Sequence, residues 1–122
     1  MSKSVRAIRG ATTIDLDEAK QVTERVQELV AEMFASNGVD QEDVISIFFT
    51  ATEDISSMYP ATAARALGLD EVPLMGAQEL TVEAMTPRCI RIMAHVTTDL
   101  TRTQITHVYQ YDARSLRSDL VK

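Results

Sequence analysis

The feature that most constrains the fold is an amphipathic segment followed by a nearly continuous apolar run. From Asp17 to about Asn37 the apolar residues recur at helical spacing, Asp17 and Glu18 favour the amino-terminal end of a helix, and Gly38 stands where a helix would stop. Residues 44–51, VISIFFTA, have the length of a strand and so few polar side chains that we expect both of its faces to be buried. A long helix lying on a sheet is therefore predicted.

Further strands and a short helix surround this pair. Additional strands are predicted at residues 5–10, 72–75, 89–98 and 105–111. Pro60 at a first helical position and Gly68 at a stop position predict a short helix over residues 60–67. Pro73 places the strand at 72–75 at an edge or end of the sheet, because proline cannot donate a ladder hydrogen bond.

The last two predicted strands are expected to form a hairpin. Residues 89–98 and 105–111 would pair through a turn around residues 99–104. That pairing puts His95 and His107 on facing strands. An acid-base pair of histidines and two polar residues on a half-exposed sheet are both compatible with this placement.

The element order predicts an α/β (α+β) fold, with one mixed five-stranded sheet packed by one long and one short helix on one side. A length of 122 residues is that of one domain, residues 1–122, with a tail after about residue 115. Two helices cannot cover both faces of five strands. The second face would then be buried by other copies of the same chain.

Composition excludes several classes of function. The net charge is −6, and 11 of the 18 acidic residues lie between Asp15 and Asp54, so nucleic-acid binding is not expected. The sequence has no apolar run of membrane-span length and no signal-peptide pattern, which predicts a cytoplasmic protein with no membrane partner. It also lacks the GxGxxG, Walker, GxSxG and HExxH motifs. With one cysteine, Cys89, interpreted as a small core residue, we expect no metal site and no cofactor.

The informative positions are arginines within apolar patterns. Arg91 lies in the middle of CIRIMAHV, and a buried guanidinium requires an anion, either Glu79 or a bound ligand. Arg9, at the end of the first strand, fits a solvated strand end or an anion site, and Arg65 and Arg117 taken singly resemble surface charges. Nine of the 12 basic residues are arginines, which grip carboxylates in a bidentate fork. Together these residues suggest an arginine-lined pocket for a compact dianion at an interface.

Several longer motifs then occur in a specific order. They are VRAIRGATT at 5–13, TATEDISSMYPA at 50–61, VPLMGAQEL at 72–80, CIRIM at 89–93, HVY at 107–109 and LR at 116–117. In order and spacing these motifs resemble the monofunctional, homotrimeric α/β class of bacterial chorismate mutases. The resemblance implies a trimeric pseudo-α/β-barrel with active sites between adjacent subunits. It also implies the pericyclic rearrangement of chorismate to prephenate in aromatic amino acid biosynthesis, a reaction that needs no nucleophile, metal or cofactor.

The resemblance also implies roles for individual residues. Arg9 is similar to the arginine that holds a substrate carboxylate, Arg91 to the one that hydrogen-bonds the ether oxygen, and Glu79 to the glutamate that receives the ring hydroxyl. Tyr109 matches a tyrosine that contacts a carboxylate, and Tyr59 an aromatic wall. The other positions implied to line the site or to close on the ligand are Ala61, Arg65, Leu74, Met75, Gly76, Leu116 and Arg117.

The sequence departs from the family pattern at several positions. Met75 stands where Thr is frequent, Gly76 where a Cys contacts the ligand and supports the glutamate, and Thr62 where a Lys adds charge at the rim. Ser118 stands where Pro follows the LR pair. Two alternatives accompany the leading interpretation: a trimeric imine or enamine deaminase of similar architecture, and a non-catalytic trimer that binds a dianion for regulation.

Overall fold

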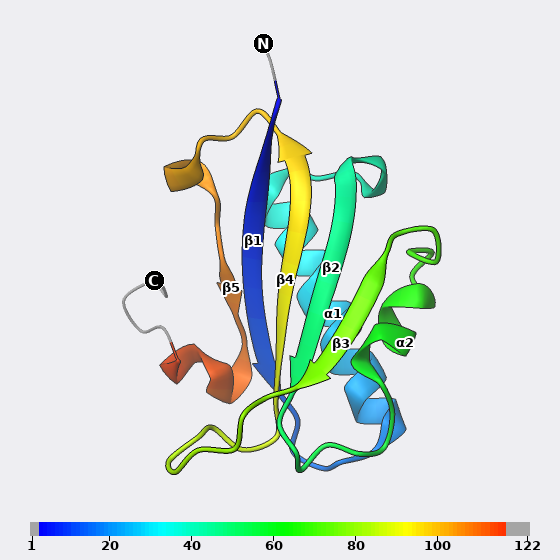
Figure 1. Ribbon diagram of the computed structural model, residues 1–122, viewed down its shortest axis with the longest axis vertical. Helices are drawn as coiled ribbons and strands as arrows, with labels where there is room; N and C mark the ends of the chain where they lie inside the picture. Colours follow the sequence, from blue (N-terminus) through cyan, green and yellow to red (C-terminus); the bar gives the residue numbers. More distant parts are fainter. Residues whose placement is uncertain (1–2, 117–122) are drawn as a thin grey trace.

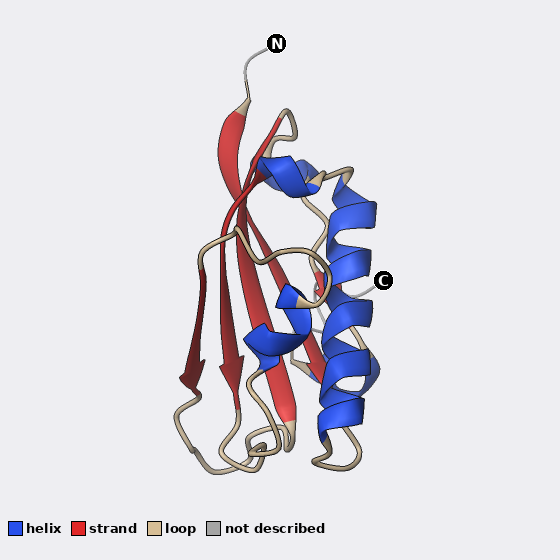
Figure 2. Ribbon diagram, turned by 90° about the vertical axis from the view of Figure 1, so that its right-hand side faces the viewer, coloured by secondary structure: helices blue, strands red, loops and turns tan. Residues whose placement is uncertain are grey.

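Strand-forming runs and one long helical run build a two-layer structure, which the computed structural model describes for residues 3–116. The strands are β1 (Ser4–Thr13), β2 (Val44–Ala51), β3 (Leu74–Gln78), β4 (Cys89–Thr98) and β5 (Val108–Tyr109). The α-helices are α1 (Ala19–Asn37) and α2 (Pro60–Arg65), and short 3-10 helices lie at Gln41–Asp43, Arg102–Gln104 and Tyr111–Ser115. The described α-helices cover the same face of the sheet, so the predicted α+β architecture is confirmed (Figure 2).

The sheet is mixed, in the order β3-β2-β4-β1-β5 (Figure 1). β4 lies in the centre and runs antiparallel to both β1 and β2, whereas β3 is parallel to β2 and β5 is parallel to β1. Pro73 immediately precedes β3, which is an edge strand as the proline predicts. The strand begins at Leu74 and continues to Gln78, so the predicted range 72–75 was too early.

The predicted hairpin of the last two strands is wrong. β4 is already hydrogen-bonded on both of its edges, so the following chain crosses over β1 and joins its free edge as the short strand β5. His95 and His107 therefore do not face each other. His95 lies 3.4 Å from the Ser46 hydroxyl and makes an edge-to-face contact with Phe48, while His107 accepts the backbone N–H of Arg9 at 2.9 Å.

Helix α1 packs on the sheet as its apolar spacing predicts. Val22, Val26, Leu29 and Met33 are buried, and Gly38 ends the helix in the left-handed conformation with φ 60°. Its packing partner in β1 is Gly10, where a Cβ atom would overlap Met33 Sδ and come 3.1 Å from Leu29 Cδ1. A larger residue at this position would have to displace the Met33 side chain, so glycine permits the close approach of helix and strand.

The face of the sheet without helices, which we call the open face, remains partly apolar and exposed. Its side chains include Val5, Arg9, Ala11, Phe48, Thr50, Met75, Arg91, Met93 and His95. In the single chain β2 is buried on one face only, because Phe48 is 43% exposed here whereas Phe49, on the helix side, is 1% exposed. This is the uncovered face that the helix count led us to expect. Within residues 3–116, no helix is long and apolar enough to cross a membrane.

Candidate active site

The strand register gathers several predicted site residues in one row across the open face. Arg91 on β4 lies opposite Ala11 of β1 on one side and Thr50 of β2 on the other. Ala11 in turn lies opposite Tyr109 of β5. Paired residues of neighbouring strands project to the same side of a sheet, so Thr50, Arg91 and Tyr109 share one surface.

Arg91 is held by a bidentate ion pair with Glu79. Arg91 Nε donates to Glu79 Oε2 at 2.7 Å, and Nη2 donates to Oε1 at 2.8 Å. The hydroxyl of Thr50 also donates to Glu79, and the Glu79 N–H continues the ladder to Ala51 O at 2.9 Å. Glu79 thus directly follows Gln78, the last residue of strand β3. The pair is aligned before any ligand arrives.

The pair also sets the protonation states of its members. Hydrogen bonds from Arg91 lower the pKa of Glu79 below its ordinary value of 4.5, against the opposing effect of burial. The same hydrogen bonds raise the pKa of Arg91. The Arg91 side chain is 54% exposed, so the sequence expectation of a guanidinium buried within the core is wrong for the single chain. The reason is that the strand face carrying it has no helix over it.

Arg9 and Tyr109 flank this pair on the same face. Arg9 lies opposite Met93, two positions along the strands from the Ala11–Arg91 pair, and is half-buried. Tyr109 and Leu116 pack on a small second cluster formed by Ala11, Cys89 and Ala113. Burial raises the pKa of the Cys89 thiol to about 11, which agrees with the interpretation of Cys89 as a core residue and not a nucleophile.

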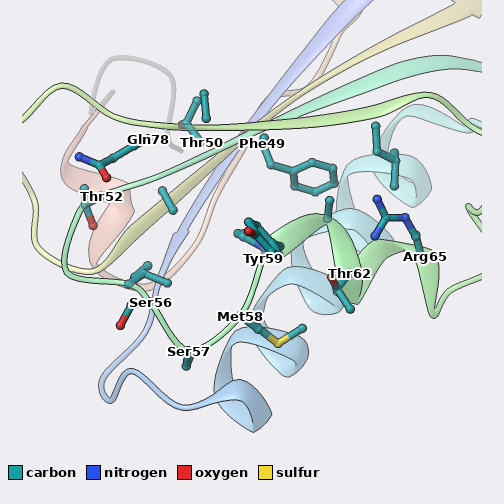
Figure 3. Close-up of a pocket in the computed structure, with 17 residues that line it drawn as sticks. Phe49, Thr50, Thr52, Ser56, Ser57, Met58, Tyr59, Thr62, Arg65 and Gln78 are labelled. Atoms are coloured by element: carbon teal, nitrogen blue, oxygen red, sulfur yellow. The ribbon is translucent and has the colours of Figure 1, made fainter.

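Five further site residues gather around a pocket of about 990 Å³ between the strands β2 and β3, helix α2 and the segment that precedes it. The predicted residues that line this pocket are Tyr59, Ala61, Arg65, Leu74 and Gly76. Figure 3 shows Phe49, Thr50 and Gln78 along the strands, with Tyr59, Thr62 and Arg65 on the opposite wall.

The structure therefore divides the predicted site into two groups. Four of the described site residues do not line the pocket, and we call them the arginine half of the site: Arg9, Glu79, Arg91 and Tyr109. Leu74 and Gly76 pair with Ile47 and Phe49, whose side chains face the helices, whereas Arg91 pairs with Thr50 on the open face. We call the group around the pocket the pocket half.

Two further predicted residues, Met75 and Leu116, lie outside the pocket. Met75 pairs with Phe48 and is 62% exposed, so its side chain lies on the open face with Arg91 and not in the pocket that Leu74 and Gly76 line. Leu116 joins the cluster under Tyr109. Arg117 and Ser118 lie outside the described residues.

The sequence reasoning missed Thr50 as a partner of Glu79. The absence of a cysteine at Gly76 had left the glutamate without an identified supporting side chain, and Thr50 supplies a hydroxyl from the adjacent strand. The alternation of side chains along the strand could have identified Thr50, because it falls on the face opposite Phe49, the face that carries Arg91. A Cβ at Gly76 would come no closer than 3.7 Å to Phe49 O, so nothing in the described chain requires glycine there.

This arrangement suits binding of an anion and stabilisation of charge. Guanidinium groups in both halves can hold carboxylates, and the Arg91 guanidinium, which Glu79 fixes, presents N–H groups on Nη1 that make no hydrogen bond within residues 3–116. Among these residues no group of three His, Cys, Asp or Glu side chains is placed to hold a metal ion.

Comparisons with known proteins agree on one family. The family model for chorismate mutase type I matches residues 5–120. The chain is 40% identical over 117 residues to chorismate mutase AroH of Thermus thermophilus, with 95% of this chain and 96% of that protein covered. It is 37% identical over 117 residues to chorismate mutase AroH of Bacillus subtilis (strain 168), with 95% and 92% covered. A solved structure of a chorismate mutase from Clostridium thermocellum matches with a TM-score of 0.88 and 41% identity, over 90% of this chain and 98% of that one.

Proposed function

The chain belongs to the chorismate mutase type I family and is a chorismate mutase, and we propose that its active site forms where the arginine half of one copy meets the pocket half of another. The observation that carries the proposal is the division of the site residues between the open face and the pocket beside α2. Neither half alone surrounds a compact dianion. The deaminase and regulatory alternatives are set aside because the family match covers residues 5–120.

The reaction is an intramolecular rearrangement of chorismate to prephenate. The ether carbon–oxygen bond breaks while a carbon–carbon bond forms in the same molecule, so no proton, electron or leaving group is exchanged. The protein must hold the flexible dianion in its compact form and stabilise the negative charge that grows on the ether oxygen.

Arg91 is the residue we assign to the ether oxygen. Its guanidinium is always charged and is already oriented by Glu79, so its positive charge needs no reorganisation as the bond breaks. Glu79, ionised at neutral pH, accepts a hydrogen bond from the substrate hydroxyl with its remaining lone pairs. Arg9 and Tyr109 on the same face contact a substrate carboxylate. Tyr59, Ala61, Arg65, Leu74 and Gly76 supply the opposite wall.

The open face supports a homotrimer. It exposes Val5, Phe48, Met75 and Met93, and an exposed apolar surface of this kind marks an interface between proteins. When two different surfaces of one chain must meet, the contact is heterologous, and such contacts form a ring when the rotation between neighbouring copies closes. A cyclic trimer would bury the open faces and build three equivalent sites. A cytoplasmic location belongs to the same proposal, and cell fractionation tests it.

The loss of chorismate absorbance, without added cofactor, tests the assignment. We expect turnover by the unmodified chain and its near abolition in Arg91→Ala. The control is Arg102→Ala, which removes an exposed arginine at the opposite end of the sheet and should retain activity. Unchanged turnover in Arg91→Ala would exclude the proposed mechanism.

A further inference from the structure

The segment between β2 and α2, residues 52–59, forms one wall of the pocket. Ser56, Ser57, Met58 and Tyr59 all line it, and none of them belongs to a helix or strand. Among the backbone hydrogen bonds of the described residues, only that of the Ile55 N–H to Thr52 O, at 3.1 Å, lies within the segment, so the position of the segment depends on partners from elsewhere in the chain.

Asp17 holds the middle of the segment. Its Oδ2 accepts the Ser56 N–H at 2.9 Å and the Ser56 hydroxyl at 3.1 Å, and its Oδ1 accepts the Ser57 N–H at 3.1 Å. Hydrogen bonding by Ser57, and then by Ser56, lowers the pKa of Asp17 to about 2 against a smaller opposing effect of burial, so the carboxylate is ionised throughout the neutral range. Ser56 and Ser57 lie immediately before Met58 and Tyr59 in the pocket wall.

The sequence had assigned Asp17 to the start of helix α1. The helix begins at Ala19, and Glu18 at its N-cap makes no side-chain capping bond. Asp17 precedes both and binds a segment about 40 positions further along the chain. Its carboxylate therefore serves the pocket wall and not the helix end.

Helix α1 holds the same wall at two further points. The Thr23 hydroxyl donates to Met58 Sδ at 3.2 Å, and Gln27 Nε2 donates to the Ala63 carbonyl in α2 at 3.1 Å. Asp17, Thr23 and Gln27, in chain order, thus contact Ser56, Met58 and Ala63, which also follow one another along the chain. Of the three, Asp17 alone supplies a charge, and hydrogen bonds to a charged acceptor are the stronger kind.

We propose that Asp17 is a positioning residue for substrate binding, which fixes Ser56 and Ser57 and thereby the Tyr59 wall of the pocket. The proposal rests on the proposed function, since it takes the pocket as one half of the chorismate site. The pocket half does not contain Arg91, whose charge acts on the breaking bond. Loss of Asp17 should therefore weaken binding of the ground state and the transition state alike, which raises KM and leaves kcat nearly unchanged.

The experiment compares Asp17→Ala and Asp17→Asn with Asp15→Asn as the matched control. Asp15 is an exposed carboxylate two positions away that pairs with Arg25 at 3.1 Å and touches no pocket residue. We expect KM for chorismate to rise about tenfold in Asp17→Ala, the effect of one charge-assisted hydrogen bond. Asp17→Asn keeps one acceptor oxygen, so its KM should lie between those of the unmodified chain and Asp17→Ala. Asp15→Asn should match the unmodified chain.

A second readout does not depend on activity. Hydrogen exchange of the Ser56 and Ser57 amides should become faster in Asp17→Ala and stay unchanged in Asp15→Asn. If Asp17→Ala fails to fold, Asp17→Asn carries both measurements. Unchanged exchange at these amides would overturn the positioning role. A lower kcat at unchanged KM would overturn it too, since it would mean only a smaller folded fraction.

Tyr59→Ala separates this proposal from the proposed function. If exchange becomes faster in Asp17→Ala but KM does not move, while Tyr59→Ala does raise KM, the Asp17 proposal is wrong and the pocket assignment stands. If Tyr59→Ala also leaves KM unchanged, the pocket is not part of the substrate site, and both fail.

Discussion

At the scale of single residues, the central feature is an arginine fixed before the substrate binds. Glu79 and Thr50 hold the Arg91 fork in one orientation, so its positive charge is in place when charge develops in the transition state. A charge on a flexible chain would first have to lose conformational freedom. We therefore expect the fixed, bidentate geometry of the Arg91 guanidinium to matter for catalysis in addition to its positive charge.

Substitution of Arg91 tests this point. Arg91→Ala removes the charge, and we expect kcat to fall by about 100-fold to 1,000-fold or more, the range for loss of one preorganised donor. Arg91→Lys keeps the charge but cannot make the two parallel bonds to Glu79, so we expect it to lose most of the activity as well. Steady-state kinetics with chorismate measure both. Activity of Arg91→Lys near that of the unmodified chain would show that charge alone suffices.

The unfolding free energy should respond differently to an added methyl group at Gly10 and at Gly76. Gly10→Ala drives a Cβ into Met33 and Leu29 under helix α1, and we expect a loss of about 1 to 3 kcal/mol in unfolding free energy from overpacking. Gly76→Ala meets only Phe49 O at 3.7 Å in the edge strand β3, so stability should stay within about 0.5 kcal/mol or rise slightly. Urea unfolding compares the two variants. Equal losses would contradict the packing described for β1 and α1.

At the scale of elements, the connection after β3 carries Glu79 to the centre of the sheet. The Glu79 N–H continues the β2–β3 ladder to Ala51, and its carboxylate then reaches Arg91 on β4. Strands β2, β3 and β4 are thus tied together by one ion pair as well as by backbone hydrogen bonds.

The lowered pKa of Glu79 predicts an acid-dependent loss of stability. Because folding lowers this pKa, the contribution is complete above the ordinary value of 4.5 and is lost as the pH falls through the lower folded value. In Glu79→Gln the side chain does not titrate, so the unfolding free energy should fall less steeply on acidification below about pH 4.5. Urea unfolding at a series of pH values measures the slopes. Identical slopes in both proteins would contradict the ion pair.

The elements also show what the sequence can and cannot predict. Helix α1, strand β2 and strand β4 follow from local apolar spacing and end where Gly38 and the turn residues predict. The partner of β5 did not follow, because it depends on which strand edges are already paired, a property of the whole sheet. The Arg91–Glu79 contact was foreseen as one of two options. The placement of Met75 and Gly76 on opposite faces of the sheet could not be predicted, since it depends on the register of β3 against β2.

At the scale of the whole molecule, the open face and the divided site point to the same assembly. The exposed apolar residues of β1, β2, β3 and β4 surround the arginine half, so a second copy that covers them would also bring its pocket half near Arg91. Burial of this face and completion of the site are then one event.

A charge placed on the open face should disrupt both properties together. Phe48 is 43% exposed and contacts His95 at the centre of this face, so Phe48→Asp should lower the sedimentation coefficient to that of a monomer and abolish turnover. Ala31→Asp, on the exposed side of α1, is the control and should leave both unchanged. A monomeric Phe48→Asp variant with full activity would contradict a site shared between copies.

The most direct test mixes two impaired variants, Arg91→Ala and Arg65→Ala, which damage different halves of the site, and assays them at chorismate concentrations far below KM. If each site takes its arginine half from one copy and its pocket half from another, random exchange of subunits rebuilds about one quarter of the sites with both halves intact. We predict that chorismate turnover recovers to about one quarter of the unmodified level after dissociation and reassembly of the mixture. Turnover that stays at the level of the separate variants, with subunit exchange verified, would contradict the account.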